Sequence, residues 1–105
     1  MEKYFVYILV CADGSFYVGV TNDVDRRVAE HNLGEIEDAY THERRPVRLV
    51  HCSGFSSVFD AISWEKQLKG WSRAKKRALI DNDWQRIHRI VCDERFVREH
   101  RKPKA

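Results

Sequence analysis

The stretch VYILVCADGSFYVGVTNDVDRR, residues 6–27, contains two strand-like runs joined by a tight turn. The run 3–10 is rich in β-branched and aromatic residues, and the run 16–20 has the same character. The Asp-Gly dipeptide between them favours a hairpin turn. The stretch therefore predicts an antiparallel β-hairpin, which places Tyr7 and Tyr17 side by side.

The residues after the hairpin predict further helices and one more strand. Side-chain oxygens at 21–23 can cap a helix start, and Gly34 and Gly70 supply stop or break signals. We expect, in chain order, a helix over 21–34, a loop over 35–46, a strand over 47–55 and helices over 57–71 and 72–83. This β-β-α-β-α-α order predicts an α/β fold of the α+β type, with a central three-stranded antiparallel sheet flanked by helices.

The length of 105 residues predicts one domain. We expect the folded domain to occupy 4–83. The remainder, 84–105, is then a C-terminal extension that ends in a basic tail, EHRKPKA, which we expect to be partly disordered.

Charge and cysteine content restrict the class of protein. The net charge of +3 permits an anionic partner without requiring one. Three widely spaced cysteines without a CxxC pair argue against a disulfide framework and against a structural zinc site. Together with the lack of a signal peptide or long apolar run, they predict a reducing, cytoplasmic location and no membrane association.

Two polar residues share the apolar face of the first predicted helix. Val24, Arg27, Val28 and His31 stand at helical spacing, so they lie on one side. The valines should pack on the sheet. In the structural interpretation, the arginine stem covers apolar surface and the histidine closes the apolar seam.

A carboxylate interrupts the apolar stripe of the second predicted helix. The stripe consists of Val58, Ala61, Ile62, Glu65 and Leu68. Desolvating a charge is costly, so Glu65 needs a cation or a wet cleft. One interpretation is an ion pair with Arg27 or another basic residue. The other is a catalytic or metal-binding carboxylate, because magnesium prefers oxygen ligands and often takes only one or two from the protein.

Each tyrosine alone is best explained as a strand residue whose hydroxyl needs a hydrogen bond. Taken together, however, these residues combine a phenol near cationic groups, a planar guanidinium and a carboxylate. The first loses its proton more easily, the second binds phosphate, and the third can hold a metal ion. That combination suits phosphodiester hydrolysis.

At these residues the sequence resembles the GIY-YIG nuclease family, over roughly 4–80. FVY (5–7) matches its first motif and YVG (17–19) its second. The family's arginine, ten residues past the second-motif tyrosine, falls on Arg27, and EHN (30–32) contains its histidine. The metal-binding glutamate falls on Glu65, in a block typical of the family's small, single-domain bacterial branch.

The chain departs from the first motif at Phe5, where the family has glycine. Val6 and Val18 replace isoleucines and preserve strand positions. The phenylalanine lies outside the chemistry, so we do not expect it to abolish activity.

The resemblance implies a one-metal hydrolysis of DNA. Glu65 would hold Mg²⁺ or Mn²⁺ on the scissile phosphate, and Arg27 would stabilise charge on the phosphoryl oxygens. Tyr7 or Tyr17 would help to deprotonate the attacking water, which a free phenol with a pKa near 10 does poorly without metal and arginine. His31 would assist proton transfer or bind phosphate. The sequence leaves open which tyrosine is the base.

Basic residues predict where DNA would bind, although a solvated helix face is the simpler explanation for most of them. The candidates for phosphate contacts are Arg26, Arg44, Arg45, Lys66, Lys69, Arg73 and Lys76. Without a second domain to select a sequence, we expect weak or structure-directed binding. The family resemblance implies branched or nicked DNA, in repair or recombination, as candidate substrates.

Two other functions compete with the endonuclease. The first is a DNA-binding module of the same fold that cuts little unless a protein partner is present. The second is an interaction protein whose contact surface is the tail 94–105. The intact set of five candidate residues favours the nuclease, because a degenerate binder would be free to lose Glu65 or Arg27.

Overall fold

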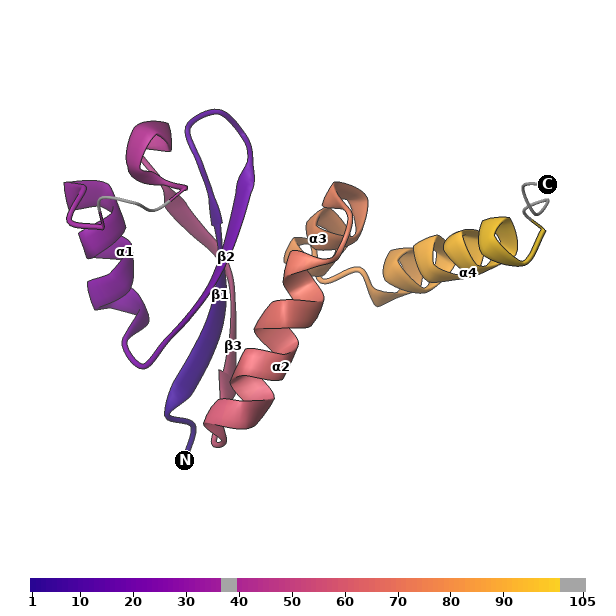
Figure 1. Cartoon of the computed structure of the whole chain (residues 1–105), viewed down its shortest axis with the longest axis horizontal. Helices are drawn as coiled ribbons and strands as arrows, with labels where there is room; N and C mark the ends of the chain where they lie inside the picture. Colours follow the sequence, from indigo (N-terminus) through magenta and orange to yellow (C-terminus); the bar gives the residue numbers. More distant parts are fainter. Residues whose placement is uncertain (37–39, 101–105) are drawn as a thin grey trace, which may run out of the picture. The chain divides into compact units, whose positions relative to one another are not determined.

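A computed structural model describes residues 1–36 and 40–100, the last seven by their backbone alone. The elements are β1 (Tyr4–Val10), β2 (Phe16–Thr21), α1 (Val24–Leu33), the 3-10 helix η1 (His42–Arg44), β3 (Arg48–Phe55), α2 (Val58–Lys69), α3 (Arg73–Ile80) and α4 (Trp84–His100) (Figure 1). The predicted α+β class and three-stranded antiparallel sheet are confirmed.

The sheet has the strand order β2-β1-β3, with both pairs antiparallel. The β1–β2 turn is tight, since the Gly14 N–H donates to the Cys11 carbonyl and Gly14 has a φ of 83°. A side chain with a Cβ is strained at that angle, so glycine suits the position. In the central strand, Tyr7 lies opposite Gly19 of β2 and Cys52 of β3.

Alternation along β1 gives the sheet two buried faces. Tyr7 and Leu9 point to one face, where Val28 of α1 packs against their cluster. Val6 and Ile8 point to the other face and are also fully buried. There α2 contacts all three strands, so the sheet lies between α1 and α2 (Figure 1).

Local signals account for the helix ends. Asp23 caps α1 by accepting from the Arg26 N–H at 3.1 Å, and Gly34 closes it in the left-handed conformation with φ 74°. Ser72 caps α3 by accepting from the Lys75 N–H at 3.2 Å. Ser57 occupies the corresponding position of α2 without a side-chain cap hydrogen bond.

The chain forms two compact units, Met1–Gly70 and Trp71–Ala105. The first contains the sheet, α1 and α2, and the second contains α3 and α4. The domain boundary that we predict after residue 83 stays a prediction.

Helix α4 is an element that our sequence analysis does not predict. Trp84, Ile87, Ile90 and Val91 recur at helical spacing, but the surrounding charges obscure the period. The expected disorder of the basic tail lies outside the described residues from 101 onward, although α4 continues to His100. Among the helices of the described part of the chain, none is long and apolar enough to cross a membrane.

Candidate active site

The two hairpin tyrosines meet over a glycine. The ring centroids of Tyr7 and Tyr17 are 6.3 Å apart, and Gly19 is the strand partner of Tyr7. A Cβ atom at Gly19 would overlap the hydroxyl end of the Tyr7 ring. The second-motif glycine therefore makes room for the Tyr7 phenol.

Replacing Gly19 by alanine is expected to destabilise the fold by about 1–3 kcal/mol, as overpacking a tight core does. Tyr7 cannot move aside freely, because it is only 1% exposed and its hydroxyl is hydrogen-bonded. Urea unfolding measures the loss. Gly70→Ala is the matched control, since a Cβ there makes only ordinary contacts and φ is −82°. Equal stability of the two variants would contradict this fit.

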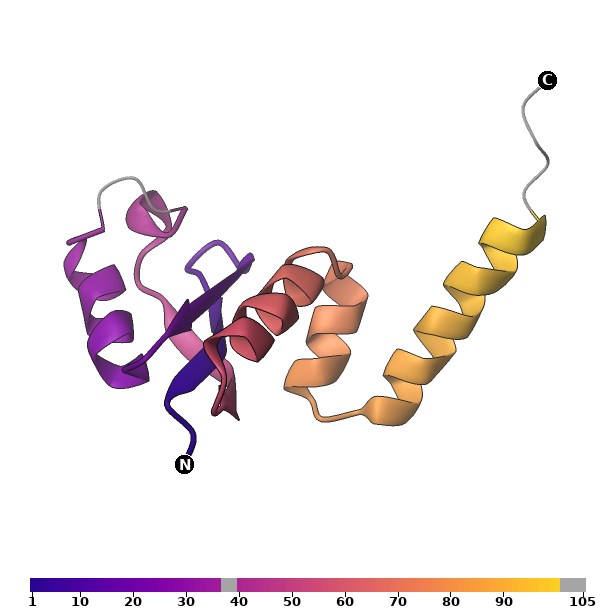
Figure 2. The same ribbon diagram turned by 60° about the horizontal axis from the view of Figure 1, so that its bottom comes forward.

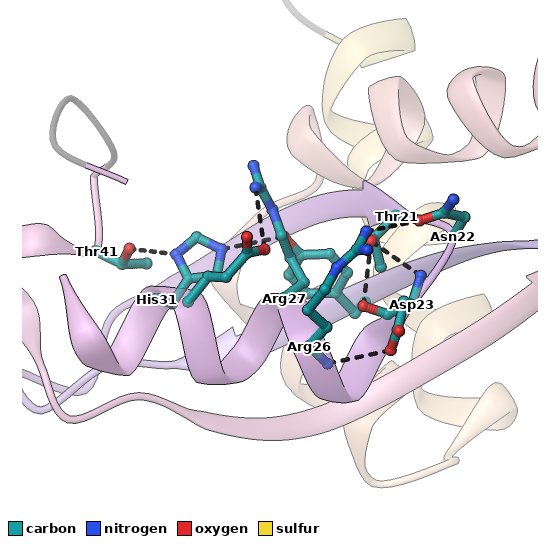
Figure 3. Close-up of polar contacts among 9 residues, drawn as sticks. Thr21, Asn22, Asp23, Arg26, Arg27, His31 and Thr41 are labelled. Atoms are coloured by element: carbon teal, nitrogen blue, oxygen red, sulfur yellow. Dashed lines mark hydrogen bonds and ion pairs between the residues drawn. The ribbon is translucent and has the colours of Figure 1, made fainter. Parts of the chain in front are cut away.

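His31 is the buried polar centre of the candidate site. It lies on α1, is 1% exposed, and its Nε2 is 3.1 Å from the Tyr7 hydroxyl. Its Nδ1 is 2.6 Å from Oγ1 of Thr41, which lies just before η1 (Figure 3). The Tyr17 ring packs edge-on to the imidazole at 5.1 Å. Both ring nitrogens thus have partners, so the ring has one defined orientation.

Arg27 stands one helical turn before His31 and pairs with Glu30 at 3.6 Å. Burial raises the pKa of Tyr7 to about 12, the nearby Arg27 guanidinium acts in the opposite direction, and the Tyr17 and Glu65 charges add to the rise. Tyr7 therefore stays protonated in the resting protein. When this hydroxyl donates to His31 Nε2, the ring hydrogen lies on Nδ1, toward Thr41; in the other tautomer, Nε2 donates to the phenol and Thr41 donates to Nδ1.

Burial first, and then the Arg27 charge, lower the pKa of His31 below 6.5. The imidazole is thus neutral at pH 7. In the unfolded chain the pKa of this histidine returns to about 6.5. Below that pH the unfolded state binds a proton that the folded state does not, so the free energy of unfolding decreases as the pH falls through this range.

We therefore expect the urea midpoint to fall between pH 7.5 and pH 5.5, and to fall less in His31→Gln. His51 contributes in the same direction, because burial also lowers its pKa, so part of the dependence will remain. His88→Gln on exposed α4 serves as the control. An unaltered pH dependence in His31→Gln would show that the ring is not held neutral.

Glu65 comes from α2, on the other face of the sheet. Its side chain is 13% exposed, and its Oε1 is 2.5 Å from the Lys69 ammonium. Of the two interpretations of Glu65 left open above, the structure therefore shows an ion pair, with Lys69 and not with Arg27. Its charge still acts on Tyr7, whose pKa rises mainly through burial and further through this carboxylate.

Glu65 is suited to bind a divalent cation whose remaining coordination positions are filled by water and substrate. Within the described residues, no group of three or more His, Cys, Asp or Glu side chains could enclose a metal ion. Magnesium usually takes one or two protein carboxylates and fills its other positions with water and phosphate oxygens. A single, mostly buried carboxylate that keeps one exposed lysine as partner matches that requirement, and Lys69 would have to yield the oxygen.

Comparison with known proteins supports the motif assignment. A family model described as the GIY-YIG catalytic domain matches residues 3–78. The chain belongs to the GIY-YIG family. That family contains nucleases that act on DNA.

Proteins similar to this chain include small GIY-YIG-type proteins. The chain is 41% identical over 87 residues to the UPF0213 protein of Syntrophus aciditrophicus, covering 83% of this chain and 100% of that one. It is 48% identical over 75 residues to a UPF0213 protein of Halobacterium salinarum, covering 71% and 96%. The solution NMR structure of the protein EF2693 from E. faecalis is similar with a TM-score of 0.54 and 36% identity, over 78% of this chain and 90% of that chain.

In this GIY-YIG chain, two of the predicted DNA-binding arginines are bound to their own loop. Arg44 pairs with Asp13 of the hairpin turn at 3.1 Å, donates to the Tyr40 carbonyl at 2.8 Å and covers the Tyr40 ring at 3.8 Å. Arg45 donates to the His42 carbonyl at 2.7 Å. These contacts fix the loop, and a DNA-binding role for either arginine stays a prediction.

The other predicted DNA-binding residues are distributed over both units. Arg26 lies on α1 and donates to the Asn22 side chain at 3.2 Å (Figure 3). Lys66 and Lys69 lie on α2 in the first unit, whereas Arg73 and Lys76 lie on α3 in the second. A DNA-binding role for these residues stays a prediction.

Two residues that support the site are not among the site residues predicted from the sequence. Thr41 lies in a polar segment without a period, yet it holds His31. Asn32 follows His31 in the EHN run, and its amide donates to the Val47 carbonyl at 3.0 Å and accepts from the Val47 N–H at 2.7 Å. These two hydrogen bonds tie the end of α1 to the segment that leads into β3, and so fix the position of His31.

Proposed function

We propose that the chain is a divalent-metal-dependent endonuclease that hydrolyses phosphodiester bonds in DNA. The observation that carries the proposal is the Tyr7 hydroxyl, which is 3.1 Å from His31 Nε2 and within electrostatic reach of Arg27, Tyr17 and Glu65. A phenol that has an acceptor in contact and a cation and a carboxylate within electrostatic reach has the parts that general base and phosphoryl chemistry need.

Proton transfer would run through Tyr7 and His31. The attacking water gives its proton to the Tyr7 oxygen while the Tyr7 proton passes to neutral His31, 3.1 Å away. A phenol with a pKa of about 12 is almost never ionised at neutral pH, but this coupled transfer does not require Tyr7 to be ionised beforehand. Tyr17, which packs on His31, would orient the water or a phosphate oxygen. On this basis we propose Tyr7 as the base.

Charge stabilisation would fall to Arg27 and Glu65. Arg27 can present its planar donors to phosphoryl oxygens, where charge builds in the transition state. Glu65 is the residue that would hold Mg²⁺ or Mn²⁺, and the ion, when bound, supplies Lewis-acid stabilisation of the phosphate.

A DNA-binding module that needs a partner before it cuts is the second candidate. One observation favours it: Lys69 neutralises the carboxylate that a metal ion requires. For either function we propose structure-directed action on branched or nicked DNA, in repair or recombination in the cytoplasm.

The test is cleavage of supercoiled plasmid and of a branched duplex with Mg²⁺, with Mn²⁺ and with a chelator. Tyr7→Phe is expected to lose about a hundredfold in rate, the lower end of what a general base contributes. Tyr4→Phe, which removes a hydroxyl from the same strand outside the site, is the matched control. Equal cutting by Tyr7→Phe and wild type would mean a contaminant or another site. Cleavage that persists in chelator would refute the proposal that the reaction requires a divalent cation.

A further inference from the structure

Charge is divided unevenly between the two compact units. Residues 71–105 contain eleven Lys and Arg against five Asp and Glu, a net charge of +6. Residues 1–70 contain eight Lys and Arg against eleven Asp and Glu, a net charge of −3. The unit that contains the candidate active site therefore has the same sign as DNA, and long-range attraction to a polyanion comes from the other unit.

Residues 81–83 form the corner between α3 and α4, and two acidic side chains there make contacts within the unit. Asp81 accepts from Arg86 at 2.7 Å and pairs with Arg77 at 3.5 Å. Asp83 caps α4 by accepting from the Arg86 N–H at 3.0 Å. These aspartates are engaged within the unit, and one carboxylate between two arginines still leaves a net positive charge.

Both helices of the unit present basic residues, and Arg73 lies at the end of α3 away from the corner. Arg73, Lys76 and Arg77 share one side of α3 at spacings of three and four, and Arg89 is exposed on α4. Figure 2 shows α3 and α4 meeting at the corner and diverging from it. Trp84, 58% exposed with its indole N–H bonded to Asn82, adds an aromatic surface of the kind that stacks on nucleic acid.

We propose that the α3–α4 unit is the DNA-binding element of this chain, and that it holds the phosphate backbone for the active site in the acidic unit. The inference rests on the proposed function, because it assigns a role in DNA cleavage to this unit. DNA binding by the unit can nevertheless be measured without cleavage. It assigns Arg73 and Arg89 as phosphate contacts and makes the nuclease unit a poor DNA binder by itself. The contacts are to phosphate, so the binding shows no sequence preference.

The experiment compares duplex DNA binding by full-length variants, in chelator, across a salt series. Arg73→Gln/Arg89→Gln is expected to weaken binding at least about tenfold and to reduce the slope of log K against log salt by about 1.8. Lys3→Gln/Arg48→Gln is the matched control, because it removes two exposed cations from the acidic unit and reaches the same net charge. Arg73→Lys/Arg89→Lys should retain the affinity and the slope.

Equal weakening in the Arg73/Arg89 and Lys3/Arg48 variants would overturn the proposal, because net charge alone would then explain binding. An unchanged slope in the Arg73/Arg89 variant would overturn it as well. The cleavage rate at saturating DNA separates this inference from the proposed function. The Lys3/Arg48 variant should keep the wild-type rate there, whereas a wild type that binds as described but never cuts refutes only the nuclease.

Discussion

Glu65→Gln is expected to reduce metal-dependent DNA cleavage by at least about a thousandfold, the upper range for removing one electrostatic stabiliser. Glutamine keeps the shape of the side chain but loses the charge that a divalent cation requires. Removing this charge also takes away one contribution to the high pKa of Tyr7, which would assist the base. The measured loss of cleavage rate is therefore the loss from weaker metal binding, reduced by the smaller gain from the lower pKa of Tyr7.

Folding should survive this substitution. The ion pair that is lost joins Glu65 to an exposed lysine, and such pairs contribute about 1 kcal/mol or less. Asp60→Asn, an equivalent change at an exposed position of the same helix, is the control for cleavage and for urea unfolding. A Glu65→Gln protein that cuts within tenfold of wild type would exclude this carboxylate as the metal ligand.

Arg27→Gln is expected to lower the cleavage rate at saturating DNA by about a hundredfold to a thousandfold. Two effects act in the same direction. The variant loses the cation at the phosphoryl oxygens, and it loses the guanidinium that opposes the rise in the pKa of Tyr7. Tyr7 then becomes harder to deprotonate, so the base and the charge stabilisation fail together.

Arg27→Lys separates charge from geometry, because lysine keeps the charge without the planar fork. It should recover only part of the rate in single-turnover measurements. Arg48→Gln, on an exposed part of β3, should cut as wild type does. Full activity in Arg27→Gln would remove the arginine from the mechanism.

The sequence predicts the hairpin well because its signals are local. The Asp-Gly turn and the two apolar runs define the pair of strands, and Tyr7 and Tyr17 then lie within 6.3 Å of each other. Helical spacing likewise predicts that Arg27 and His31 share a side of α1. These parts of the site depend on periodicity and turn chemistry, which a single sequence displays.

The rest depends on contacts that periodicity does not encode. Thr41 reaches His31 from an irregular segment, and Lys69 is one of several cations that could have paired with Glu65. Arg44 is visible in the sequence as a charge, but its partner Asp13 lies 31 residues away. Long-range side-chain pairing therefore needs the structure, even where the elements themselves are predicted correctly.

The burial of His31 between Tyr7 and Thr41 makes the site visible to spectroscopy without substrate. In either tautomer the ring N–H of His31 is hydrogen-bonded to a hydroxyl oxygen and screened from water, so it exchanges its hydrogen slowly. It should therefore give its own proton resonance, well separated from the backbone amides. That resonance reports, in one spectrum, whether a variant still holds its imidazole in place, and it distinguishes a protein with lost chemistry from one with a collapsed site.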